Sequence, residues 1–267
     1  MSKQSFRFQL TIVSAVVAAA AWAETPPASQ RNFVSCPIVR DTPTVPCWLS
    51  EYDGELYYLG IQTDVSADFD PPYLGHRVLV EGTLTDAPRI CGGLVLEPVR
   101  TSVLPELDAT CNEIWPAEDR YTVPFAPRPP GPSGGRLAFD PPPGAARPAP
   151  PPIDPSVPRE FEIDYDFDML IMGRHAPVLG RILRHAEEVG ARRISVTGYA
   201  GATLLSDGTL MSEPASIAEK RAHEIAVLLK GAGLDDVAYS IDVGIDETPA
   251  DGVEDWQSRR SVVVVFP

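Results

Sequence analysis

The spacing of apolar and polar residues changes several times between residues 159 and 267. Alternation with period two, bounded by turns, predicts four strands, at residues 161–167, 193–198, 237–243 and 261–266. Apolar side chains on one face of a 3.6-residue period predict two helices, at residues 177–189 and 216–230. The order β-α-β-α-β-β predicts an α+β sandwich in which both helices cover one face of the sheet.

The segment from residue 31 to residue 120 has a different pattern. Short alternating or aromatic-rich runs bounded by Gly and Pro predict strands at residues 55–61, 76–82 and 93–98. No convincing amphipathic helix period is found there. We therefore expect a small, mostly β domain, built as a sheet or a partly closed barrel.

All four cysteines of the chain fall in this first domain, at Cys36, Cys47, Cys91 and Cys111. An even number of cysteines in an exported protein favours two disulfides, with three possible pairings. A zinc site is the alternative, but the cysteines are 11, 44 and 20 residues apart and no C-x-x-C pair occurs. Disulfides are the stronger prediction, and the pairing stays open.

Residues 124–158 separate the two domains and hold 14 of the 29 prolines. Runs of proline favour extended polyproline II and cannot build a core. We expect a linker that at full extension, about 3.1 Å per residue, reaches roughly 100 Å. A plain spacer and a spacer that crosses part of the periplasm are both consistent with it.

The N-terminus has the pattern of a secretory signal peptide, residues 1–23. Lys3 and Arg7 precede an apolar run at residues 10–21, and an Ala-x-Ala site ends at Ala23. The run is shorter than the roughly 20 residues of a spanning helix, although an uncleaved anchor is the alternative. We expect export to the periplasm, with association to the outer membrane open, and no transmembrane span in the mature chain.

Charge and motifs narrow the function classes. A net charge of -15 disfavours nucleic acid as a partner, because both molecules are then negative. The chain has no nucleophile elbow, P-loop, H-E-x-x-H or dinucleotide-binding glycine pattern, and its four histidines are scattered. We therefore expect no catalytic residues, no metal and no cofactor.

The last domain carries a set of short motifs in a fixed order. The second strand ends in Gly-Tyr-Ala-Gly at 198–201, the second helix carries Ile-Ala-Glu-Lys-Arg-Ala at 217–222, and the last strand opens with Ser-Arg-Arg at 258–260. In this order they make residues 159–267 resemble the OmpA C-terminal family. The resemblance implies an OmpA-like domain that binds peptidoglycan non-covalently, through the diaminopimelate of the stem peptide.

The resemblance also implies ligand residues. Arg221 stands at the position of the family arginine, whose guanidinium can bind a carboxylate with two parallel hydrogen bonds; a solvated helix arginine is the alternative. The family aspartate is replaced by Gly201, in a loop about five residues longer than the family's. Asp207 is either a substitute carboxylate or a turn residue. Tyr199 replaces the family histidine, and Arg259 either supports the site or caps an acidic strand surface.

Two functions remain after these observations. The first is a cell-envelope protein that tethers peptidoglycan through its OmpA-like domain while the first domain engages an envelope protein. The second is a periplasmic protein–protein interaction module whose OmpA-like fold has lost peptidoglycan binding. The first is the leading hypothesis, because signal peptide, spacer and family-like domain follow in that order, and the changes at Gly201, Pro214 and Ala218 relative to the family motif motivate the second.

Overall fold

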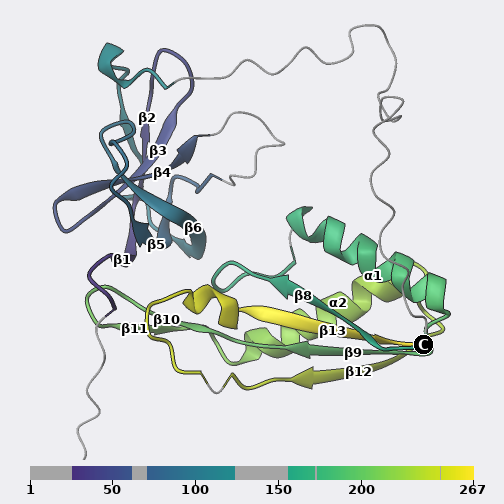
Figure 1. Ribbon diagram of the computed structural model, residues 1–267. Helices are drawn as coiled ribbons and strands as arrows, with labels where there is room; N and C mark the ends of the chain where they lie inside the picture. The colour runs from purple at the N-terminus through teal and green to yellow at the C-terminus, as the bar shows by residue number, and fades with distance from the viewer. Residues whose placement is uncertain (1–25, 62–70, 124–155, 172, 247) are drawn as a thin grey trace, which may run out of the picture.

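The computed structural model of the protein describes residues 26–61, 71–123, 156–171, 173–246 and 248–267 (Figure 1). The predicted signal peptide and nearly all of the proline-rich linker lie outside these ranges and stay predictions. Within the described ranges, no helix is both long and apolar enough to cross a membrane. These described ranges combine two α-helices with many strands, so the mixed class expected from the sequence is found.

The N-terminal part forms a seven-stranded sheet in the order β1-β5-β6-β4-β3-β2-β7. Its strands are β1 (Gln30–Ser35), β2 (Pro37–Arg40), β3 (Cys47–Tyr52), β4 (Glu55–Ile61), β5 (His76–Leu84), β6 (Leu94–Leu107) and β7 (Glu113–Trp115), and a 3-10 turn, η1 (Asp119–Tyr121), follows. The three strands predicted from the sequence correspond to β4, β5 and β6. The strands β1, β2, β3 and β7 were not predicted.

This sheet is made of two layers that meet where β4 and β6 pair over two residues, Tyr57 with Leu94 and Tyr58 with Val95. Antiparallel pairing joins β1, β5 and β6 in one layer, and β2, β3 and β4 in the other (Figure 1). Two apolar clusters are buried against this sheet: one around Phe33 and Leu59, to which strands of both layers contribute, and one around Leu49. The sheet therefore curves around two small cores.

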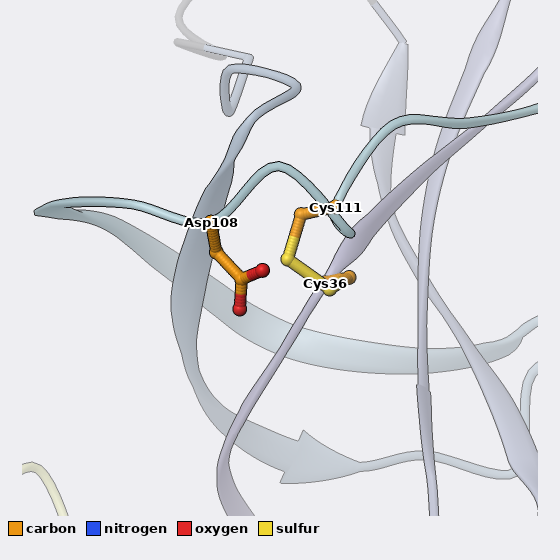
Figure 2. Close-up of side chains that lie close together, drawn as sticks. All are labelled: Cys36, Asp108 and Cys111. Carbon is orange, nitrogen blue, oxygen red and sulfur yellow. A yellow bond between two sulfur atoms is a disulfide. The ribbon is translucent and has the colours of Figure 1, made fainter.

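Two disulfides cross-link this domain, Cys36 to Cys111 and Cys47 to Cys91. They resolve the pairing that the sequence left open. Asp108 lies beside the first disulfide, and its carboxylate and the two sulfurs lie within 4.8 Å of one another (Figure 2). Metal ligation by cysteine requires a thiolate, and both sulfurs are bonded to each other, so this cluster offers no thiolate ligand.

The C-terminal part is a four-stranded sheet in the order β12-β9-β13-β8, with two helices against it (Figure 1). Its main elements are β8 (Arg159–Asp164), α1 (Ala176–Val189), β9 (Arg193–Gly198), α2 (Ser216–Gly231), β12 (Ala238–Val243) and β13 (Arg260–Phe266). All six correspond to elements predicted from the periodicity. A two-stranded hairpin, β10 (Ala202–Leu204) and β11 (Leu210–Ser212), and the 3-10 turns η2 (Gly173–His175) and η3 (Asp255–Ser258) were not predicted.

Alternating positions of the strands face the helices and form the core of this part. The buried apolar residues are Phe161, Ile163, Tyr165, Ile182, Ala186, Ile194, Val196, Ala222, Ile225, Leu229, Leu234, Val263 and Val265. α1 ends at Gly190, which adopts the left-handed conformation (φ 60°) and donates its N–H to the helix carbonyls. Gly198 lets β9 approach α2 closely, because a Cβ there would lie 2.0 Å from the carbonyl oxygen of Ala218.

One buried residue makes the stability of this core sensitive to pH. His185 on α1 is 2% exposed and packs with its ring tilted against that of Phe161, and neither ring nitrogen has a hydrogen-bond partner in the described part of the chain. Burial, with a smaller contribution from Arg159, lowers the pKa of His185 below its usual value of 6.5. The folded state therefore disfavours a proton that the unfolded state takes up.

We expect His185→Leu to flatten the pH dependence of stability. Below about pH 6.5 the wild type loses stability as pH falls, by at most about 1.4 kcal/mol per pH unit from this residue. Urea unfolding at pH 7.5 and pH 5.5 measures the difference. His223→Leu, at an exposed position of α2, is the control and should keep the wild-type dependence. Equal pH dependence in the wild type and His185→Leu would contradict the assignment.

Candidate functional site

The arginine at the family ligand position is completely enclosed. Arg221 lies in the second turn of α2 and is 0% exposed. Its Nε donates to the carbonyl oxygen of Met169 at 3.0 Å, and Nη1 and Nη2 donate to the carbonyl oxygens of Tyr199 and Asp166 at 2.9 and 3.3 Å. The remaining N–H groups of Nη1 and Nη2 bond a carboxylate, that of Glu213. Since a guanidinium has five N–H groups, all of them are satisfied inside the chain.

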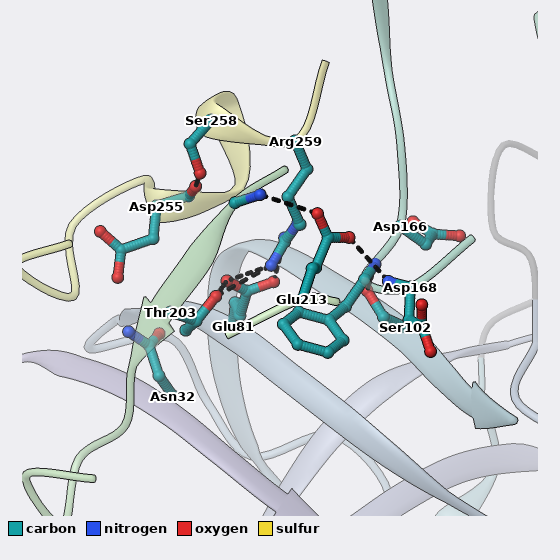
Figure 3. A network of polar contacts seen from close by, with 12 residues as sticks. Asn32, Glu81, Ser102, Asp166, Asp168, Thr203, Glu213, Asp255, Ser258 and Arg259 are labelled. Carbon is teal, nitrogen blue, oxygen red and sulfur yellow. Dashed lines mark hydrogen bonds and ion pairs between the residues drawn. The ribbon is translucent and has the colours of Figure 1, made fainter. Parts of the chain in front are cut away.

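Glu213 fills the place of a bound carboxylate. Its two oxygens accept from Nη1 and Nη2 of Arg221 at 2.8 and 2.6 Å, a bidentate pair. The same oxygens accept from the backbone N–H groups of Asp168 at 2.7 Å and Gly201 at 2.8 Å (Figure 3). A fork of two guanidinium donors with two converging backbone donors is a receptor for a carboxylate, and in this structure the carboxylate belongs to the protein itself.

Aromatic packing closes the site further. The guanidinium of Arg221 lies 4.4 Å from the ring centre of Tyr165, which is itself 1% exposed. Burial raises the pKa of Tyr165 to about 12, so its hydroxyl stays protonated and hydrogen-bonds Ser261 at 3.2 Å. Burial also raises the pKa of Asp168, helped by the nearby charge of Glu213. Burial is thus the largest cause of both pKa shifts beside Arg221.

Geometry explains why glycine replaces the family aspartate. A Cβ at Gly201 would lie 2.3 Å from Oγ of Ser258 and 2.5 Å from Cγ of Arg259. Any side chain at this position, including an aspartate, would collide with those atoms. The segment before β13 thus leaves room for glycine alone at this position, and the N–H of Gly201 donates to Glu213.

The other predicted ligand residues lie apart from one another. Asp207 is exposed at the tip of the β10–β11 hairpin, where its carboxylate accepts from the N–H of Thr209 at 2.8 Å, as in a turn. Tyr199 contributes its backbone carbonyl to Arg221, while its ring stacks under the guanidinium of Arg260 at 4.5 Å. The carboxylate beside Arg221 is that of Glu213 and not that of Asp207.

Arg259 binds the N-terminal domain. It is 1% exposed and forms a two-pronged ion pair with Glu81 of β5, 178 residues away in the sequence (Figure 3). Thr203 of β10 completes the cluster, accepting from Arg259 at 2.9 Å and donating to Glu81 at 2.9 Å. The alternative that Arg259 caps an acidic strand surface is therefore not what the structure shows, because its partner is in another domain.

More contacts surround this ion pair and join the two domains. Asn32 of β1 donates its side-chain amide to the carbonyl oxygens of Leu204 and Gly252 at 3.0 and 2.7 Å, and its backbone pairs with Ser206. Phe167 packs with Leu79 and Leu104 in one buried apolar cluster. The polar and apolar parts of this contact together make a packed intramolecular interface beside the Arg221 site.

Two acids that are central to the site were missed from the sequence. Glu213 stands in the lengthened loop just before Pro214, and the extra loop length was the available signal. Glu81 sits at an ordinary alternating position of β5, and nothing in its neighbourhood indicates a partner 178 residues away. Asp255, whose carboxylate accepts from three backbone N–H groups of residues 204, 251 and 252, was also missed.

Comparison with known proteins gives limited matches. No family model and no curated protein matches this chain. The structure of the cell wall anchor of the T6SS from Pseudomonas aeruginosa is similar at 20% identity and a TM-score of 0.33, over 41% of this chain and 81% of that one. The OmpA-like domain of FopA1 from Francisella tularensis subsp. tularensis SCHU S4 is similar at 15% identity and a TM-score of 0.32, over 43% and 78%. At these TM-scores neither structure assigns a function to this chain, and the function has to be argued from the chain's own residues.

Proposed function

We propose that this chain is a cell-envelope interaction protein in which the OmpA-like fold is a docking platform for the N-terminal β domain and does not bind peptidoglycan through Arg221. The observation that carries the proposal is that every N–H group of the Arg221 guanidinium is hydrogen-bonded to atoms of the same chain. A ligand carboxylate would have to displace Glu213 and break a buried bidentate ion pair. The ligand would then form the same kind of pair that Glu213 already forms, so the exchange gains no ion pair and still requires Glu213 to leave the enclosed site.

The interface between the domains supports the same conclusion. Arg259, the first arginine of the Ser-Arg-Arg motif, is hydrogen-bonded to Glu81 and Thr203 and is almost completely buried. Both arginines that a stem peptide would need are therefore used to hold the chain together. The signal peptide predicted at residues 1–23 supports a periplasmic location, where an envelope protein is the expected partner.

Cosedimentation with purified peptidoglycan sacculi tests the proposal. We expect the mature chain from residue 24 to stay in the supernatant, like its Arg221→Ala variant, while an OmpA-like domain with both the family aspartate and arginine sediments as a positive control. Saturable retention of the wild type that soluble diaminopimelate stem peptide competes away would overturn the proposal. The competition arm makes this outcome independent of whether Arg221→Ala folds.

One observation favours the second candidate, peptidoglycan binding. The donors around Glu213 are those of a carboxylate receptor, so a ligand carboxylate could replace Glu213 if the β10–β11 hairpin moved. This candidate predicts that Glu213→Gln, which removes the competing charge, increases retention on sacculi. Unchanged background retention of Glu213→Gln supports the interaction module instead.

A further inference from the structure

The four-stranded sheet of the C-terminal part has one outer strand whose free edge is not protected by charge. β12 and β8 are the two outer strands (Figure 1). β8 has charged side chains at four of its six positions, and such charges hinder pairing with a further strand. β12 carries one charge in six residues, that of Asp242, and contains no proline. Within the described ranges, β9 is the one strand that pairs with β12.

The hydrogen bonds of β12 show which of its backbone groups face outward. The N–H of Ala238 donates to the carbonyl oxygen of Arg192, just before β9, at 3.1 Å. The N–H of Gly244 donates to the carbonyl oxygen of Gly198, at the end of β9, at 2.8 Å. Successive residues of a strand direct their N–H and C=O groups to opposite sides, so even-numbered residues face β9 and odd-numbered residues face away, with pairs about 6.6 Å apart. The outward-facing residues of the strand are Tyr239, Ile241 and Val243.

Apolar side chains border this edge on the helix side of the sheet. Tyr239 and Ile241 pack against the core beneath the helices, and Val243, two residues further along, points the same way and is 55% exposed. On α2, the ammonium group of Lys230 lies 4.9 Å from the ring centre of Tyr239. Val227, three residues before Lys230 and on the same side of α2, is 63% exposed. Apolar side chains of an added strand would therefore meet exposed valines on this side.

The other face of the same edge is polar and acidic. Ser240 and Asp242 alternate with the apolar residues of β12 and point away from the helices. Asp235 and Asp236, just before the strand, are exposed as well. A basic side chain opposite Asp242 on an added strand would be in range of a favourable cross-strand pair. Two copies of the chain, each with a net charge of -15 and these acids at the edge, would repel each other here.

We propose that the free edge of β12 binds an extended segment of an envelope protein, which adds a fifth strand to the sheet. The segment alternates apolar side chains, facing Val227 and Val243, with basic side chains, one of which pairs with Asp242. Hydrogen bonds to the outward backbone groups supply affinity, and the alternating side chains supply selectivity. This inference rests on the proposed interaction role and names the surface and the partner chemistry for it. The edge does not include Arg221, so a failure here leaves the account of peptidoglycan binding unchanged.

Hydrogen exchange of the 15N-labelled mature chain tests the edge residue by residue, with a capped synthetic peptide, Lys-Val-Thr-Val-Lys-Val-Thr, as the probe. In the free chain, the amides of Ser240 and Asp242 should be protected, and the outward amides of Tyr239, Ile241 and Val243 should exchange quickly. We expect the peptide to protect the outward amides saturably. Absence of saturable protection overturns the proposal. Protection that rises with protein concentration without peptide assigns the edge to a second copy and overturns it too.

Variants and a control peptide make the result specific. Asp242→Asn should weaken peptide binding about two- to fivefold, as loss of a cross-strand charge pair does. Val243→Pro removes one outward donor, keeps the bond from Gly244 to β9, and should weaken binding roughly tenfold. Glu160→Gln, an exposed acid of β8 at the opposite edge, is the matched control and should leave the affinity unchanged. Equal affinity of the wild type for this peptide and for one with Glu in place of Lys would contradict the proposal even if Val243→Pro failed to fold.

Discussion

Arg221→Ala is expected to lower the free energy of unfolding by about 3–5 kcal/mol. The change leaves the carboxylate of Glu213 buried with two backbone donors and without its cation. It also frees the carbonyl oxygens of Met169 and Tyr199, which lose their guanidinium donor. Urea denaturation monitored by circular dichroism measures the effect.

Two further variants decide whether the ion pair is the cause. Lys220→Ala, one residue away on the exposed face of α2, should change stability by less than about 0.5 kcal/mol. Glu213→Leu combined with Arg221→Met should lose less than Arg221→Ala, because neither charge is then left alone. An Arg221→Ala protein within about 1 kcal/mol of the wild type would mean that the pair is not the buried structure described here.

Glu81→Ala is expected to separate the two domains. In the docked state, Arg259 would stay buried with only Thr203 as a side-chain partner. A buried charge without its counter-ion destabilises the docked state by about 3–5 kcal/mol and leaves the undocked state unaffected. When the two domains separate, Arg259 is hydrated and this destabilisation disappears, so the state with separated domains is favoured. We expect a larger radius of gyration in small-angle X-ray scattering and two separate calorimetric transitions.

Glu51→Ala is the control for the docking experiment. Glu51 is an exposed acid of β3 in the same domain and has the same side chain to lose. It should keep the wild-type radius and a single transition. A Glu81→Ala protein that remains as compact as Glu51→Ala would show that the remaining contacts, such as those of Asn32 and Phe167, suffice for docking.

The elements of the C-terminal sheet could be predicted because each is long enough to show its period. β8, β9, β12 and β13 alternate over six or seven residues, and α1 and α2 span 14 and 16 residues. The hairpin β10–β11 was missed because each strand has three residues, too few to show alternation. In the first domain, β2 and β7 were missed for the same reason.

The site could be predicted in part. The order of the motifs predicted the position of Arg221 but not its surroundings. Its burial depends on a loop and on a second domain, and neither has a local sequence pattern that predicts the contact. The sequence offered Asp207 as the acid, since Asp-Gly in a long loop can serve as a ligand or a turn, and the structure has the turn. Glu213 and Glu81 act at long range through the fold, and single-sequence periodicity does not report such contacts.

The central claim is that Glu213 occupies the carboxylate receptor at Arg221 and leaves no room for a cell-wall ligand. The most direct measurement is the Nε–H resonance of Arg221 in the 15N-labelled mature chain during titration with a soluble diaminopimelate stem peptide. The account predicts a narrow, solvent-protected resonance that does not move at millimolar peptide. A saturable shift of that resonance, accompanied by exchange of its proton with water, would contradict it.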